Sequence, residues 1–212
     1  MRLPRLLALS LACLGCGEST PPSPPAPKAE APAPPPGPPT PRFVEVAKEA
    51  GLTTVLVSGG PDKDHILEST GTGCAFVDYD GDGRLDVYLV NAWALDEDPS
   101  QVRLKGRNAL YRNKGDGTFE DVTEEAGVGD DSWGCGVSVA DYDGDGYEDM
   151  FLYKWGRCEL FRNDAGKGFV RATDEAGLPA WMNVGCASWF DYDRDGRVDL
   201  FLGGYWPDDL DL

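Results

Sequence analysis

The sequence has a single histidine, His65, among 212 residues. One histidine supplies almost none of the residues needed for catalytic triads, histidine-ligated zinc sites or histidine general bases. Basic residues are also scarce, since 19 Lys and Arg stand against 37 Asp and Glu, for a formal net charge of −18. Nucleic acids and anionic membrane surfaces both attract clustered Lys and Arg. The composition argues against either as a partner, and it directs attention to how the acidic residues are placed.

The apolar run at residues 6–15 is too short to cross a bilayer as a helix. It follows two arginines and ends at Cys16, between two glycines. This order resembles a bacterial lipoprotein signal, in which the cysteine is lipidated and becomes the first residue after cleavage. We therefore expect residues 1–16 to direct export, and lipid on Cys16 to tether the protein at the outer membrane, on the periplasmic or cell-surface side. An ordinary cleaved signal peptide and lipidation at Cys13 remain alternatives.

Residues 17–41 form a proline-rich segment, in which 12 of the 25 residues are proline. The remainder is mostly small or charged, so the segment cannot bury a core, and we expect a disordered linker. Proline favours the extended polyproline II conformation, at about 3.1 Å per residue, which gives a reach of roughly 75–80 Å. The linker would hold a folded module, expected at residues 42–212, away from the lipid. A proline-rich ligand for another domain is the alternative.

Three sequence phrases recur in the remaining chain. One reads RFVEVAKEAGL, TFEDVTEEAGV and GFVRATDEAGL, at residues 42–52, 118–128 and 168–178. Another is L-aromatic-R-N, at residues 110–113 and 160–163. The third is acidic: DYDGDGRLD, DYDGDGYED and DYDRDGRVD, at residues 78–86, 141–149 and 191–199. The last two copies of every phrase are 50 residues apart, whereas extra residues before 78 and before 110 read as loop insertions. A period of 40–50 residues predicts a propeller or a solenoid.

The acidic phrases, here called the Asp loops with positions numbered 1 to 9, have the spacing of a chelating turn. Carboxylates at positions 1, 3, 5 and 9 converge around a turn that Gly at position 6 permits, and the peptide carbonyl of position 7 can add a ligand. Such hard oxygen donors favour Ca²⁺, and three loops predict about three ions. The predicted ligands are Asp78, Asp80, Asp82, Arg84 and Asp86; Asp141, Asp143, Asp145, Tyr147 and Asp149; and Asp191, Asp193, Asp195, Arg197 and Asp199.

Two other interpretations of the Asp loops were weighed. An EF-hand needs a bidentate Glu at position 12 and flanking helices, but position 12 is Leu89, Leu152 or Leu202. The flanking residues are short, apolar and aromatic, which is typical of buried strands and places each loop in a β-hairpin. Solvated acidic turns without metal are the remaining alternative.

One repeat then reads as four antiparallel strands: two around the Asp loop, one with L-aromatic-R-N, and a fourth such as residues 119–123. Four such strands make a propeller blade. The three phrases together, over residues 42–206, resemble the FG-GAP/VCBS repeat family, and within it the cartilage acidic protein and ASPIC/UnbV group. The resemblance implies an all-β propeller, calcium in the loop between the first two strands, and extracellular recognition. Arg194 replaces Gly at position 4 of the third loop, which is not a ligand position.

The repeat count departs from that family, whose propellers close with about seven blades. Only about three blades are present, and the third has no L-aromatic-R-N phrase before Leu212. We therefore expect an incomplete propeller: either a fragment of a longer one, or an open stack that associates with further copies of itself.

Cysteine and tryptophan also recur in the repeats. Cys74, Cys135 and Cys186 precede the three loops, and with Cys158 they could form disulfides or remain buried thiols. Trp93, Trp155 and Trp206 each fall six or seven residues after position 9. They would lie beyond the second strand, on the face opposite the loops, where they could bind a sugar ring or a protein partner, or pack between blades.

The sequence favours a calcium-binding, tethered module that recognises an extracellular protein or glycan. An enzyme on a propeller scaffold and a non-functional fragment are the alternatives. A catalytic site would need acids and bases outside the chelating loops, and none is evident in the sequence.

Overall fold

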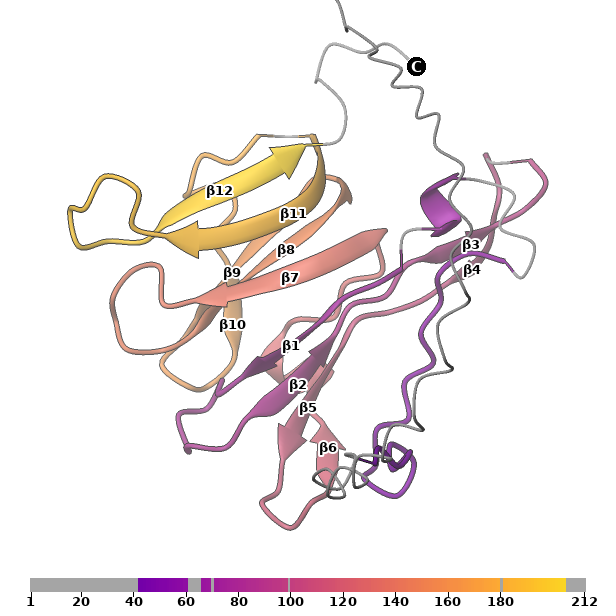
Figure 1. The fold of residues 1–212 in the computed structure, drawn as a ribbon, viewed down its shortest axis with the longest axis horizontal. Coiled ribbons are helices and arrows are strands. Elements are labelled where there is room, and N and C mark those ends of the chain that lie inside the picture. Colours follow the sequence, from indigo (N-terminus) through magenta and orange to yellow (C-terminus); the bar gives the residue numbers. More distant parts are fainter. Residues whose placement is uncertain (1–41, 61–65, 70, 99, 180, 205–212) are drawn as a thin grey trace, which may run out of the picture. The chain divides into compact units, whose positions relative to one another are not determined.

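The structure, a computed structural model, describes residues 42–60, 66–69, 71–98, 100–179 and 181–204 (Figure 1). The chain divides into two compact units, Met1–Phe43 and Val44–Leu212. Of the first unit only residues 42–43 are described, so Cys16 and the expected linker lie outside the described residues, and Trp206 does too. Within the described part, no helix combines the length and hydrophobicity needed to cross a membrane.

The second unit is nearly all β and contains two four-stranded antiparallel blades that follow the predicted strand order. The first blade consists of β1 (Cys74–Val77), β2 (Asp86–Leu89), β5 (Ala109–Asn113) and β6 (Phe119–Asp121). The second consists of β7 (Gly134–Ala140), β8 (Asp149–Gly156), β9 (Glu159–Asn163) and β10 (Phe169–Arg171). The prediction of blades is thereby confirmed for both repeats.

A third hairpin follows, formed by β11 (Met182–Phe190) and β12 (Asp199–Gly204). The start of β11 also pairs with the end of β8, where Asn183 lies opposite Trp155. Figure 1 shows the two blades and the hairpin beside one another, with the described strands leaving the arrangement open. The fold is therefore an incomplete, propeller-like array.

Two expectations about local structure were wrong. The residues inserted between 86 and 110 are not a plain loop, because β3 (Trp93–Leu95) and β4 (Val102–Lys105) pair as a separate hairpin. The fourth strand of the first blade stops at Asp121, whose Oδ1 accepts hydrogen bonds from the backbone N–H and hydroxyl of Thr123. That turn starts the short helix α1 (Thr123–Ala126), which Gly127 ends with a left-handed φ of 72°. The insertion before β1 holds a 3₁₀ turn, η1 (Ile66–Ser69).

The core consists of layers between successive repeats rather than one central mass. One cluster joins a buried face of the first blade, including Tyr88 and Leu110, to Met150 and Phe161 of the second. A further cluster joins Phe151 and Leu160 of the second blade to the third hairpin: Val184, Ala187, Trp189, Leu200 and Leu202. Both clusters are buried by stacking one repeat against the next, as expected of repeat architectures. A smaller cluster on the first blade, with Val87, Ala109 and Tyr111, packs against Leu52 instead.

A buried ion pair holds the segment between the blades to the second blade. The ammonium group of Lys154 lies 2.9 Å from the Asp130 carboxylate and 2.8 Å from the Ser132 hydroxyl, and its side chain is almost fully buried. Glu159, 3.8 Å from the ammonium group, in turn pairs with Arg171. Burial alone would raise the pKa of Asp130, but hydrogen bonds from Ser132 and Lys154 outweigh it, so the pKa lies below its usual value.

Asp130→Asn should destabilise the fold by about 3–5 kcal/mol, because it leaves the Lys154 charge buried without its nearest carboxylate. Asp130→Asn/Lys154→Met should recover most of that loss, because both charges are then gone. Urea unfolding of the three proteins measures this coupling.

The pH dependence gives an independent check of the same pair. A carboxylate whose folded pKa is depressed stabilises the protein above its unfolded pKa, about 3.9, and this contribution is lost as the pH falls through the folded value. The stability difference between wild type and Asp130→Asn should therefore be full at neutral pH and shrink below about pH 4. A difference that did not change across this range would contradict the assignment.

Candidate metal centres

The three Asp loops occupy the turns of the first hairpin in each repeat, as predicted. Position 9 lies directly opposite the residue that precedes position 1: Asp86 opposite Val77, Asp149 opposite Ala140, and Asp199 opposite Phe190. Figure 1 shows these turns projecting at one end of the blades. The EF-hand interpretation is excluded, since strands flank all three loops.

Hydrogen bonds inside each loop bend the backbone around the carboxylate at position 1. In the first loop the Asp78 carboxylate accepts the backbone N–H groups of Asp82, at 3.1 Å, and Gly83, at 2.9 Å. The second and third loops repeat both bonds with Asp141 and Asp191. These bonds turn the backbone inward and bring the acidic side chains together.

Position 4 needs a left-handed backbone, and the third loop adopts it without glycine. Gly81 and Gly144 have φ values of 72° and 77°, and Arg194 has 66°. For a non-glycine residue this conformation costs roughly 1–2 kcal/mol. Because the third loop keeps its internal hydrogen bonds, Arg194 does not change the loop geometry.

The loops bring together three of the four predicted carboxylates. Positions 1, 3 and 9 each offer an oxygen, and in every loop these oxygens lie within 4.8 Å of one another. The clusters are Asp78, Asp80 and Asp86; Asp141, Asp143 and Asp149; and Asp191, Asp193 and Asp199. Such a set of hard oxygens suits a divalent cation.

Position 5 lies outside these clusters. The carboxylates of Asp82, Asp145 and Asp195 instead accept the backbone N–H of position 7 at 2.8–2.9 Å. Those N–H groups belong to Arg84, Tyr147 and Arg197, whose carbonyls were predicted as ligands. Asp82 also pairs with the Arg84 guanidinium.

Position 9 ties each loop to the rest of its blade. Asp149 accepts the backbone N–H of Tyr142, at 3.0 Å, and that of Asn163, at 2.7 Å. Burial raises the pKa of Asp149 to about 6, these two N–H groups oppose the rise, and the carboxylates of positions 3 and 5 add to it. Asp86 is held in the same way by Tyr79 and Asn113, and its pKa is also raised to about 6.

The asparagine that ends the L-aromatic-R-N phrase connects the third strand to the Asp loop. This contact explains why the phrase recurs, for which the sequence alone gave no reason. Besides its backbone bond to position 9, the amide of Asn113 donates to the Leu85 carbonyl, and Asn163 donates to the Glu148 carbonyl. The third strand is thus attached to the loop through both its backbone and its side chain. In the sequence, this role was indicated by the recurrence of Asn at the same position of the phrase, 50 residues apart.

The first and second loops also contact each other. The Glu148 carboxylate accepts the backbone N–H of Asp78 at 2.9 Å, and the Asn163 amide donates to the Tyr79 carbonyl at 2.8 Å. Loop geometry in one blade therefore depends on the blade that follows it.

Tryptophan pairs form at both junctions between repeats. Trp93 meets Trp133 at 5.9 Å between ring centroids, and Trp155 meets Trp181 at 5.8 Å. The indole N–H of Trp93 donates to the Asp131 carbonyl, and Lys105 lies 4.4 Å from its ring. Trp133 and Trp181 were not singled out in the sequence because they precede the loops at unequal distances.

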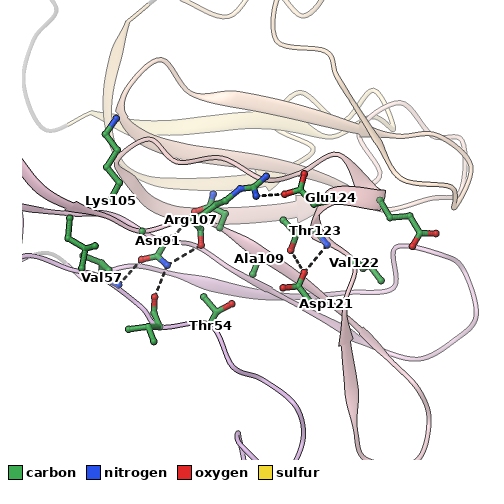
Figure 2. A pocket seen from close by; sticks show the side chains of 15 residues that line it. Thr54, Val57, Asn91, Lys105, Arg107, Ala109, Asp121, Val122, Thr123 and Glu124 are labelled. Atoms are coloured by element: carbon green, nitrogen blue, oxygen red, sulfur yellow. Dashed lines mark hydrogen bonds and ion pairs between the residues drawn. The ribbon is translucent and has the colours of Figure 1, made fainter.

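A pocket of about 590 Å³ lies beside the first blade, between residues 54–57, the β4–β5 connection and the start of α1 (Figure 2). The buried Asn91 amide lines the pocket; it accepts the Val57 N–H and donates to the Val55 and Arg107 carbonyls. Arg107 pairs with Glu124 at the rim. Most of its polar groups are thus engaged with one another, so we assign it no ligand.

The four cysteines of the described residues are free thiols in the structure. Cys74, Cys135 and Cys186 lie on the first strand of each hairpin, as expected, and Cys158 is buried. Burial raises the pKa values of Cys135 and Cys158, which keeps both thiols protonated and unreactive.

These features define a class of protein: an all-β chain of tandem four-stranded repeats, each with an acidic loop in its first hairpin. The pattern of the FG-GAP-like repeat matches residues 78–152 and 141–202, so the chain belongs to the FG-GAP-like repeat family.

Two curated relatives are similar to part of this chain. Cartilage acidic protein 1 of Xenopus tropicalis is 46% identical over 52 residues, and cartilage acidic protein 1 of Homo sapiens is 45% identical over 51. Each match covers 24% of this chain and 8% of the relative. The chain therefore matches only a small part of the length of these relatives.

Proposed function

We propose that this chain is a calcium-binding repeat module that is exported, tethered by lipid, and recognises an extracellular protein or glycan. The three carboxylate clusters at positions 1, 3 and 9 of the Asp loops carry this proposal. Binding is favoured over catalysis because the three Asp-loop clusters are assigned to metal, and the other acidic group, Asp130 and Glu159, is held in a buried ion-pair network with Lys154.

Calcium fits the chemistry of the clusters. Three carboxylates with oxygens within 4.8 Å repel one another, and burial of Asp86 and Asp149 strengthens that repulsion. A divalent cation would remove it, and three ions would offset six of the 18 net negative charges. Position 5 and the carbonyl of position 7 would complete the set of oxygens. Extracellular calcium modules bind with dissociation constants of about 10⁻⁴–10⁻³ M, so occupancy would need roughly millimolar calcium.

Calorimetric titration should detect three calcium-binding events in the wild type and two in Asp143→Asn. Asp143 belongs to the second cluster, and its side chain makes only a long 3.3 Å hydrogen bond within the loop, so the fold should survive. Each site at a hundredfold excess of calcium over its dissociation constant adds about 2.7 kcal/mol of stability. EDTA should accordingly lower the melting temperature of the wild type.

Glu175→Gln is the matched control, since it removes one exposed acid outside the loops and should leave three events. Asp145→Asn tests the fourth ligand, and we expect it to weaken the same event that Asp143→Asn removes. If the protein takes up no calcium and EDTA does not change its melting temperature, the calcium proposal is wrong and the loops are acidic turns without metal.

The recognition surface is proposed at the tryptophan pairs. Trp93 lies on β3, after the second strand of its blade, but Trp155 lies near the end of the second strand β8 itself, which corrects the expected position. Trp93 is engaged by Trp133, Lys105 and the Asp131 carbonyl, so it acts mainly in packing. Trp155 supports Trp181, whose side chain is 44% exposed and offers a free aromatic surface. A partly exposed aromatic pair can stack on a sugar ring or anchor a protein side chain.

Trp181→Ala should weaken binding on a glycan array or to a captured protein by about twofold to twelvefold, with circular dichroism unchanged. Loss of aromatic contact accounts for about 0.5–1.5 kcal/mol. Trp93→Ala, the comparison variant, should instead lower the melting temperature. If Trp181→Ala only unfolds the protein and no ligand binds the wild type, the Trp155–Trp181 pair serves only in packing of the core.

Export and tethering are proposed from the sequence around Cys16. Cys16→Ala should move the protein from the membrane fraction to the soluble fraction, because a cysteine thiol is the expected site of lipid attachment. Cys13→Ala serves as control and should stay with the membrane. Release by Cys13→Ala alone would reassign the acceptor, and retention of both variants would refute the lipoprotein interpretation.

A further inference from the structure

Position 8 of the Asp loop differs from one repeat to the next. It is Leu85 in the first loop, Glu148 in the second and Val198 in the third. Of these three side chains, that of Glu148 alone can accept a hydrogen bond. Among the described residues its carboxylate is not part of the cluster that positions 1, 3 and 9 of its own loop form.

The Glu148 carboxylate reaches the preceding loop. Its Oε2 accepts the backbone N–H of Asp78 at 2.9 Å. The Asp78 side chain belongs to the first carboxylate cluster, and it accepts the backbone N–H of Gly83 at 2.9 Å. The residue around which the first loop bends is therefore held by its own loop through its side chain and by the second loop through its backbone.

Asn163 provides a second link between the same two loops. Its backbone N–H donates to Asp149, at position 9 of the second loop, and its side-chain amide donates to the Tyr79 carbonyl, at position 2 of the first. The N–H of Tyr79 donates in turn to Asp86, at position 9 of the first loop, at 3.2 Å. A series of hydrogen bonds thus joins the position 9 carboxylates of both clusters.

Close packing leaves little room for one of these loops to move without the other. A Cβ placed on Gly166, in the turn that follows Asn163, would lie 2.9 Å from the Asp80 carbonyl oxygen. A Cβ placed on Gly81 would lie 3.2 Å from the Tyr147 ring. Both distances are shorter than ordinary van der Waals contact. The conformation of the first loop therefore constrains that of the second.

We propose that the first and second Asp loops bind calcium cooperatively and that Glu148 is a positioning residue for this coupling. The inference rests on the calcium-binding function proposed above. Side chains gathered around a cation in the first loop also fix Asp78 and Tyr79, and these residues fix Glu148 and Asn163. The second loop then loses less conformational freedom when it binds, so its affinity is higher. Each site must change the affinity of the other by the same factor.

The third loop provides an internal reference. Val198 has no oxygen at position 8, so the third loop cannot repeat toward Asp141 the bond that Glu148 makes with Asp78. Asp193→Asn, in the third cluster, should therefore leave binding at the first two loops unchanged.

Calorimetric calcium titration of the full chain measures the coupling in an Asp193→Asn background, which retains the first two sites. Adding Asp143→Asn leaves the first site alone, and adding Asp80→Asn leaves the second site alone. The coupling factor is the product of the two stepwise association constants divided by the product of the two single-site constants. We expect a factor of at least about five.

Substitutions at Glu148 in the same background test its role. Glu148→Ala should lower the coupling factor, because the Asp78 N–H loses its acceptor. Glu148→Gln should retain more of the coupling than Glu148→Ala, because the amide oxygen can still accept that N–H. Glu175→Ala removes an exposed acid elsewhere in the second repeat, so it is the matched control and should leave the factor unchanged.

Circular dichroism establishes that the variants remain folded. If both sites bind calcium with a coupling factor of one, the cooperativity proposal is wrong and the calcium-binding function stands. A factor that Glu148→Ala does not lower would equally overturn the proposal. If neither site binds calcium, the proposed function fails, and the coupling fails with it.

Discussion

The buried carboxylate at position 9 of the Asp loop is the interaction on which each blade depends. Asp149 accepts N–H groups from the loop itself and from the third strand, at 3.0 and 2.7 Å, and Asp86 does the same in the first blade. One side chain thus fixes the turn of the first hairpin and its distance from the next strand. A buried carboxylate is costly unless it is hydrogen-bonded, so both N–H contacts contribute to the stability of the blade.

The sequence was sufficient to predict features that are set by local spacing. Alternate carboxylates around a glycine can converge only at a turn, and apolar flanks of four or five residues fit strands, so the three hairpins followed directly. The 50-residue offset of the L-aromatic-R-N phrase gave the strand order. The short helix after Asp121 was missed because Thr123, a strand-compatible residue, is redirected by one hydrogen-bonded turn.

Features that depend on contacts between repeats were not predictable in the same way. Lys154 corresponds in the repeat to Asn91, which binds backbone groups of residues 55–57, whereas Lys154 binds an acid from the connecting segment. Position 5 was expected among the metal ligands, but the spacing does not show that its carboxylate caps the N–H of position 7. Burial and pairing are properties of the stacked array, and a single repeat contains no signal for them.

The third Asp loop shows how much of a loop's environment its neighbours supply. Asp199 accepts the Tyr192 N–H at 2.7 Å, but the described residues provide no third strand to donate the second bond that Asn163 gives to Asp149. Asp199 is accordingly exposed, although its loop has the same internal hydrogen bonds and the same carboxylate cluster as the other two. In the blades, protein groups already hold position 9 in place. The internal hydrogen bonds therefore shape the loop by themselves, whereas burial of position 9 in the blades depends on the third strand.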